Sequence, residues 1–195
     1  SSGGKMQEYC LKNQIDYSKI PQIHSPRASF TGFLYSMLKV LRPIIPISEE
    51  NILESINELD VISNKISTNN LTETNPALDL AQWITGIPLI YYPAGLQSAA
   101  IRFKNSLQEN AKMHAMAEDI VEACHNGIVS WEQSSNVTPI LIEGEEDYIK
   151  TKERWEIVKE YFKEKNIDFK EIHTVNGSIL SKIMNLIYLL DYTSI

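Results

Sequence analysis

The chain has 195 residues, of which 43% are hydrophobic and 22% are charged, and its formal net charge is −7. This composition suffices for one large hydrophobic core or two small ones. The acidic balance, without a dense block of Lys and Arg, argues against nucleic-acid binding, and no apolar run approaches the length of a membrane span. Cys10 and Cys124 lack CxxC spacing and are predicted to be free thiols of a cytoplasmic protein, not ligands of a zinc site.

The first 70 residues are predicted to be mainly helical. The apolar spacing predicts helices over residues 5–14, 25–43 and 47–67 and a short strand over residues 15–21. Ser25 is the expected N-cap of the second helix, and Pro26 suits its first turn. The stretch TNNLTETNP, residues 68–76, is polar and turn-rich, so we place a domain boundary there.

The remainder of the chain alternates between buried-strand and helix patterns. Strands are predicted over residues 87–93, 138–144 and 169–175, and helices over residues 76–85, 97–120, 146–166 and 178–192. Such alternation predicts βαβ units, a parallel sheet and helices on both of its faces. The fold class is therefore α/β.

Glu109 is the first candidate for chemistry. If residues 97–120 form one helix, Glu109 lies on a stripe that mixes polar groups with methionines, opposite a stripe of Ala, Phe and Leu. Covering both faces would remove water from the carboxylate, raise its pKa and suit it to proton transfer. The alternative is a structural ion pair with Arg102 or Lys112.

His125 and Arg27 are the other candidates. His125 precedes the turn dipeptide Asn126-Gly127, where it can act as an acid or base or simply remain a surface residue. Arg27 lies in the first turn of a predicted helix, where a cation opposes the helix dipole, so it either serves an anionic ligand or points into solvent. No spacing of His and Cys typical of a metal site accompanies them.

Three stretches, in order along the chain, resemble the bifunctional phosphoglucose/phosphomannose isomerases, which are built from two sugar isomerase (SIS) domains. They are IPQIHSPRAS, IPLIYYPAGLQSAAIRFKNSLQENAKMHA and EACHNGIVSWE. The resemblance implies three-layer α/β/α domains, a homodimer, and no metal or other cofactor. It assigns residues 1–70 to the end of a first SIS domain with a connecting helix, and residues 71–195 to a second SIS domain truncated at its C-terminus.

The resemblance also implies an activity in carbohydrate metabolism (glycolysis and gluconeogenesis). Glucose 6-phosphate, and mannose 6-phosphate as a second aldose, would be interconverted with fructose 6-phosphate through a cis-enediol. Glu109 of the ENAK motif would move the proton between C1 and C2, and His125 of the HN motif would assist ring opening from the neighbouring subunit. Arg27 of the PRA motif would stabilise the enediolate. All three residues would also bind the substrate.

Three departures from the family pattern limit these expectations. The Ser/Thr-rich phosphate loop of the first SIS domain does not occur in this sequence. The corresponding loop of the second domain is EGEED, whose acids Glu145, Glu146 and Asp147 are expected to satisfy the following helix N-terminus and to repel phosphate. The family's C-terminal lysine would follow DYTSI, the last residues here, and Gly127 replaces the Glu that usually follows HN.

Two other function classes remain open. A SIS domain can bind a sugar phosphate without catalysis, as in transcription regulators, or it can serve only in dimerisation. A cleft that contains both Glu109 and Arg27 would favour the enzyme. The sequence does not distinguish glucose from mannose specificity.

Overall fold

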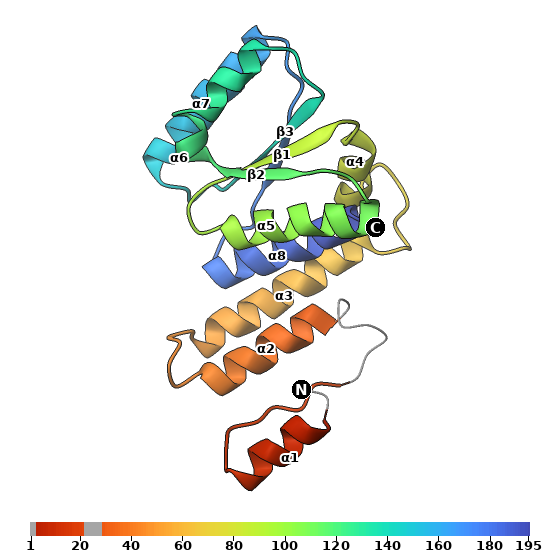
Figure 1. Cartoon of the computed structure of the whole chain (residues 1–195), viewed down its shortest axis with the longest axis vertical. Coiled ribbons are helices and arrows are strands. Elements are labelled where there is room, and N and C mark those ends of the chain that lie inside the picture. The colour runs from red at the N-terminus through yellow and green to blue at the C-terminus, as the bar shows by residue number, and fades with distance from the viewer. Residues whose placement is uncertain (1–2, 22–28) are drawn as a thin grey trace. The chain divides into compact units, whose positions relative to one another are not determined.

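A computed structural model describes residues 3–21 and 29–195 (Figure 1). The chain divides into two compact units, residues 1–49 and 50–195. The first unit contains α1 (Lys5–Lys12) and α2 (Phe30–Leu41). The strand predicted over residues 15–21 is wrong, because these residues have no regular secondary structure and no strand among the described residues of this unit could pair with them. Ser25 and Pro26 lie outside the described residues, and α2 begins later than predicted.

The second unit holds the sheet and the helices around it. Helix α3 (Glu49–Ile66) leads into it, close to its predicted bounds. The elements that follow are α4 (Pro76–Trp83), β1 (Ile87–Tyr92), α5 (Gln97–Ser106), η2 (Leu107–Ala111), β2 (Met116–Asp119), α6 (Ile120–Ala123), η3 (Gly127–Glu132), β3 (Val137–Glu143), α7 (Ile149–Glu164), β4 (Lys170–His173) and α8 (Ile179–Thr193).

The four strands form one parallel sheet in the order β2-β1-β3-β4. Helices α5 and α8 lie on one side of the sheet, and α6 and α7 lie on the other (Figure 1). The predicted α/β class and its three layers, helix, sheet and helix, are therefore confirmed. The crossovers from β1 to β2 and from β3 to β4 leave in opposite directions, which places the topological switch point between β1 and β3.

The core between the sheet and α7 is aromatic. Trp131 of η3 meets Phe162 of α7 edge to face, with ring centroids 5.1 Å apart. The Nε1–H of Trp131 donates a 3.0 Å hydrogen bond to the hydroxyl of Tyr91 on β1, so both polar atoms are satisfied inside the core. Burial raises the pKa of Tyr91 to about 12, so this phenol stays protonated.

The helix predicted over residues 97–120 is wrong in its second half. Helix α5 ends at Ser106, a π-helical turn covers Leu107–Ala111, and Met116–Asp119 is strand β2, paired with β1 from Leu89↔Met116 to Tyr92↔Asp119. The Ala, Met and Glu of this region favour a helix locally. Pairing with β1, a contact between segments distant in sequence, overrides that preference.

Candidate functional site

Glu109 lies on the π-helical turn at the end of α5, not in the middle of a long helix. The turn closes with Lys112 in the left-handed region, at φ 59°, which directs the chain away from α5 and toward β2. Glu109 is exposed on this turn. Single π-turns are uncommon in α-helices and are frequent at functional sites, so the local backbone adds to the case for Glu109.

The π-turn is held against the C-terminal end of α8. Arg102 on α5 donates two hydrogen bonds from Nε and one from Nη2 to the Asp191 carboxylate, at 3.1, 3.0 and 2.6 Å. Ser106 Oγ donates to the same carboxylate at 3.0 Å, and Asn110 Nδ2 donates to Ser194 Oγ at 2.8 Å. Because these bonds lie before and after Glu109, they fix the backbone that carries it.

The contacts to α8 reveal two residues that sequence reasoning missed. Asp191 and Ser194 belong to the stretch DYTS near the end of the chain, where the sequence predicted no site residue. They act on Glu109 indirectly, by holding the turn. The sequence did hold a signal for them, because Asp191 and Ser194 are polar residues near the end of an otherwise apolar helix. A buried or half-buried acid in such a position requires a hydrogen-bond donor from another element.

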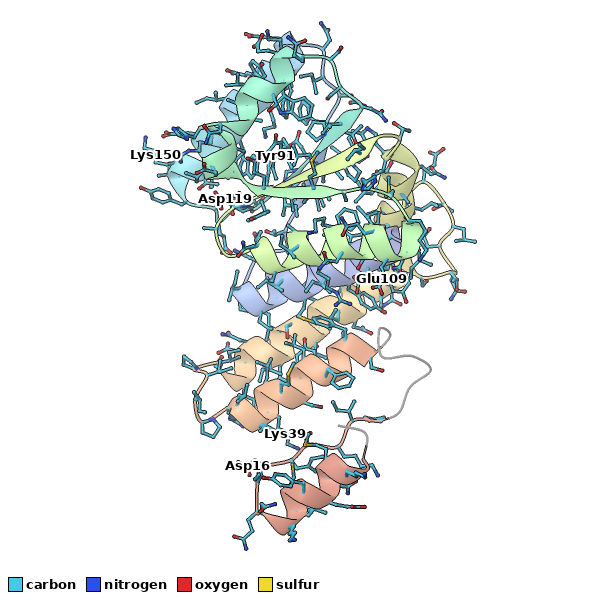
Figure 2. The ribbon with its side chains drawn as sticks, viewed as in Figure 1. Asp16, Lys39, Tyr91, Glu109, Asp119 and Lys150 are labelled. Atoms are coloured by element: carbon cyan, nitrogen blue, oxygen red, sulfur yellow. The ribbon has the colours of Figure 1, made fainter. Side chains whose placement is uncertain are left out.

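His125 follows α6 and precedes η3, and its side chain is 77% exposed. Its Nδ1 lies 4.0 Å from Glu122 Oε1, and its backbone N–H donates to Glu122 O at 2.9 Å. Glu109 precedes the amino end of β2, whereas His125 follows its carboxyl end at Asp119; Figure 2 labels Glu109 and Asp119 at these opposite ends. One copy of the chain therefore places the two candidates near opposite ends of β2.

The stripe predicted around Glu109 is wrong. Met113 lies in the loop after the π-turn, and Met116 lies on β2, so neither shares a helix face with Glu109. Arg102 and Ser106 do lie on α5, where their side chains bind Asp191. Arg27, the third candidate, lies outside the described residues.

Residues 73–195 match the family model of the bacterial phosphoglucose isomerase C-terminal SIS domain. The chain belongs to this family.

Curated relatives agree with the assignment to the SIS family. The chain is 29% identical over its whole length to a bifunctional phosphoglucose/phosphomannose isomerase of Caldicellulosiruptor bescii, covering 60% of that protein. Over 73% of its length it is 27% identical to a D-glucosamine-6-phosphate 4-epimerase of Sulfolobus acidocaldarius, covering 44% of that protein. The chain thus spans about half the length of these relatives.

A solved structure shares the fold. It is a glucose-6-phosphate isomerase-like protein of Thermus thermophilus, with a TM-score of 0.65 over 83% of this chain and 54% of that one, at 17% identity.

The carboxyl ends of the parallel strands lie along one side of this SIS-domain sheet, which we call the carboxyl edge. The loops at this edge are rich in acidic residues. The prediction that Glu145, Glu146 and Asp147 satisfy the N-terminus of α7 is wrong, because the N-cap is Tyr148 and no side chain of the described residues caps that end. Asp147 instead accepts from the backbone N–H of Gly144 at 3.0 Å and from Trp155 Nε1 at 3.3 Å. The two glutamates reach across to the loop before α8.

The loop before α8 already donates its N–H groups to carboxylates. Gly177 N donates to Glu146 at 3.4 Å, and Ser178 N donates to Glu54 of α3 at 3.1 Å. Ser181 Oγ adds a 3.0 Å bond to Glu54. In open α/β folds this edge is where anionic ligands meet backbone N–H groups. Here the protein's own carboxylates occupy those positions, so this edge offers no ready cradle for phosphate.

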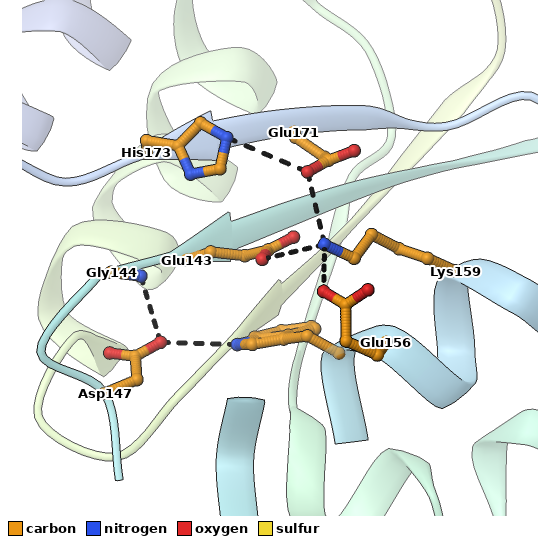
Figure 3. Close-up of polar contacts among 8 residues, drawn as sticks. Glu143, Gly144, Asp147, Glu156, Lys159, Glu171 and His173 are labelled. Atoms are coloured by element: carbon orange, nitrogen blue, oxygen red, sulfur yellow. Dashed lines mark hydrogen bonds and ion pairs between the residues drawn. The ribbon is translucent and has the colours of Figure 1, made fainter. Parts of the chain in front are cut away.

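Lys159 is the centre of a second polar cluster at the same edge (Figure 3). Its Nζ lies 2.8 Å from Glu156, 3.2 Å from Glu143 and 3.4 Å from Glu171. Burial alone would lower the pKa of Lys159, but hydrogen bonds from Nζ to Glu156 and Glu143 outweigh it and raise the pKa. Burial raises the pKa of Glu143 in spite of Lys159. The cluster keeps a cation and an acid buried together at the ends of β3 and β4.

Metal-ligating side chains do not gather around these clusters. Within residues 3–21 and 29–195, no group of three or more His, Cys, Asp and Glu side chains could hold a metal ion. Both cysteines are free thiols, as predicted. No helix in the described part of the chain is long and apolar enough to cross a membrane.

Replacing Glu54 by alanine should destabilise the second unit by removing the acceptor for Ser178 and Ser181. Hydrogen bonds from these two residues lower the pKa of Glu54. The carboxylate therefore stabilises the fold above its ordinary pKa of 4.5, and this contribution is lost as the pH falls through the lowered value. We expect a melting temperature several degrees lower at pH 7, and a difference from wild type that shrinks in acid.

Thermal unfolding followed by circular dichroism between pH 3 and pH 7 measures this effect. Glu58→Ala, on the same helix, is the matched control, since it removes an equal charge that accepts no hydrogen bond from the loop before α8. Equal melting temperatures for the two variants at pH 7 would contradict the role of Glu54.

Proposed function

We propose that this chain is part of an aldose–ketose isomerase that interconverts glucose 6-phosphate, with mannose 6-phosphate as a second aldose, and fructose 6-phosphate through a cis-enediol. The observation that carries the proposal is Glu109, an exposed carboxylate on a π-turn fixed from α8, in a chain of the phosphoglucose isomerase SIS family. The identity to a phosphoglucose/phosphomannose isomerase over the whole chain supports it.

Glu109 is the proposed base that moves the proton between C1 and C2 of the sugar. The reaction requires a carboxylate that accepts a proton from one carbon and returns it to the next. An exposed position on a fixed turn suits this role, because the side chain can reach a ligand while the backbone stays in place. Arg27 is the proposed stabiliser of the enediolate charge, a role suited to a guanidinium.

His125 is proposed to act from a second copy of the chain in a homodimer. The positions of Glu109 and His125 at opposite ends of β2 support this, because one copy keeps them apart. A two-fold axis can bring the His125 end of one copy to the Glu109 end of the other. Glu109 is exposed and the His125 side chain is mostly exposed, so a partner can reach them.

The phosphate-binding part of the site is proposed to lie in a first SIS domain, of which residues 1–70 are the end. Residues 71–195 are then the second domain. The acids at the carboxyl edge support this division, since Glu54, Glu146 and Asp147 already accept the N–H groups that would bind phosphate. Sugar 6-phosphate would reach Glu109 with its phosphate held elsewhere.

A dimerisation module without catalysis is the second candidate. The carboxyl edge favours it, because Glu146 and Glu54 already accept the N–H groups that would bind a phosphate. The two candidates differ in one measurement: a dimerisation module forms no fructose 6-phosphate at any protein concentration.

The 195 residues alone should turn over glucose 6-phosphate far more slowly than the full reading frame. The loss of phosphate contacts removes remote binding energy that positions the reacting carbons, so kcat falls together with affinity. A coupled assay of both proteins, with glucose 6-phosphate and mannose 6-phosphate, checks this. Comparable rates would mean that the phosphate site lies within these residues.

A further inference from the structure

A cavity of about 500 Å³ lies beside β2, on the α6 and η3 side of the sheet. Its wall is formed by Leu89, Met116, Ala117, Glu118, Gly127, Ser130, Trp131, Ser135 and Val137. This volume is within the range of small-molecule sites, and so is a mainly apolar lining with a few polar groups. We call it the Glu118 cavity, because Glu118 is the one ionisable side chain among the described residues that line it.

Glu118 is partly buried, and none of the described residues donates a hydrogen bond to its carboxylate or forms an ion pair with it. The Nε1–H of Trp131, a donor in the same wall, is already used by Tyr91. Burial, and then the charge of Glu122, raise the pKa of Glu118. Water still reaches this partly buried carboxylate, and a ligand that supplies a donor inside the cavity would replace that water with a charge-assisted hydrogen bond.

Gly127 explains how the carboxylate fits in the wall. A Cβ at position 127 would lie 2.8 Å from Glu118 Oε2 and 3.0 Å from Oε1. The carboxylate therefore rests over the backbone of Gly127, in space that any other residue would fill. The glycine that departs from the family's HN pattern is the residue that leaves room for Glu118.

The negative charge in and beside the cavity wall favours a cationic ligand over an anionic one. Glu118 lines the cavity and Glu122 lies close enough to raise its pKa, so a phosphate or carboxylate would be repelled. A cation is attracted by both acids, by Glu118 in the wall and by Glu122 beside it, and Trp131 contributes apolar surface to the same wall. The hydroxyls of Ser130 and Ser135 can bind a second polar group of the same ligand.

We propose that the Glu118 cavity binds a small organic molecule with an apolar body that presents a protonated amine to Glu118. Glu109 does not line this cavity and lies on the π-turn that follows α5, on the other side of the sheet. Gly127 of the wall is two residues from His125, so in the proposed homodimer the cavity would lie near the isomerase site. The test below measures amine binding without turnover, so its outcome is distinguishable from the outcome of the isomerase tests.

Binding of trans-4-aminocyclohexanol to the 195-residue chain, followed by ¹H–¹⁵N NMR titration, tests the proposal. The neutral probe trans-1,4-cyclohexanediol has the same ring without the charge. We expect the amine to shift the resonances of β2 and η3 and to bind about tenfold more tightly than the diol, the scale of one hydrogen bond to a charged group. No shift at β2 and η3 up to the solubility of the amine, or equal affinities for the two probes, would overturn the proposal.

The Glu118→Gln variant should lose the preference for the amine, whereas Glu122→Gln, an equal charge change outside the cavity wall, should keep most of it. Retention of the preference in Glu118→Gln overturns the proposal.

If that variant does not fold, the pH dependence of amine binding to the wild-type protein provides the test. The groups near Glu118 are Glu122, Tyr91 and Cys124. Tyr91 and Cys124 have raised pKa values and stay neutral in acid, so the preference must disappear as the pH falls through the raised pKa of Glu118; a constant preference contradicts the proposal.

Discussion

In the full-length protein, Glu109→Gln should reduce isomerisation by roughly 10²–10⁴-fold, the usual contribution of general acid–base catalysis. The amide keeps the size of the side chain and some of its hydrogen bonds, but it cannot accept the proton from C2 or C1. We therefore expect kcat to fall while KM changes little, because substrate binding depends on other contacts. The assay couples fructose 6-phosphate formation to a dehydrogenase, with each aldose in turn.

Proton exchange gives a second readout for Glu109. In D₂O the wild-type enzyme should exchange the C2 proton of glucose 6-phosphate with solvent, and Glu109→Gln should not. Gln108→Ala, on the same exposed turn, is the control for damage to the turn itself, and it should keep turnover within a few-fold of wild type. Turnover of Glu109→Gln in that same range would remove Glu109 from the mechanism.

Co-expressed Glu109→Gln and His125→Ala chains should recover activity that neither variant has alone. If each site combines Glu109 of one copy with His125 of the other, a mixed dimer has one site with both substitutions and one site with neither. Random pairing makes about half of the dimers mixed, each with one of two sites intact, so about a quarter of wild-type activity is expected.

Differently tagged copies of the two variants allow the mixed dimer to be purified, and its kcat per dimer should be about half that of wild type. The matched control is a double variant with both substitutions in one chain, paired with a wild-type chain. Each site of that dimer carries one of the two substitutions, so it should be inactive. An inactive dimer from the two single variants would mean that both residues serve the same copy. Wild-type activity of the His125→Ala variant alone would mean that His125 has no part in the reaction.

The parallel sheet could be predicted from the sequence because its central strands carry their own signal. β1 and β3 are continuous apolar runs, and their burial follows from pairing on both sides. β2 carries no such signal. Met116, Ala117 and Glu118 favour a helix locally, and only the register with β1 makes them a strand. An edge strand of four residues is thus determined by its neighbour more than by its own side chains.

Only part of the candidate site could be predicted from the sequence, because local motifs are visible in a sequence and long-range pairings are not. Motif spacing located Glu109 and His125, but the separation of their elements by β2 depends on a long-range pairing. The partners of the turn, Asp191 and Ser194, lie 85 and 84 positions from Ser106 and Asn110, so no local pattern joins them to Glu109. The same is true of Glu54, whose carboxylate reaches Ser178 across 124 positions.

The π-turn makes the direction of the Glu109 side chain depend on the number of residues in the turn. An α-helix rotates by about 100° per residue, and a π-turn holds one residue more than an α-turn. Deleting one residue between Ser106 and Lys112 would let α5 continue as an ordinary helix, and Asn110 would lose its alignment with Ser194. Glu109 would then point elsewhere with its chemistry unchanged. The fold of this segment should therefore tolerate substitutions at its exposed positions far better than a change in length, whereas substitution of Glu109 would remove the proposed base without disturbing the turn.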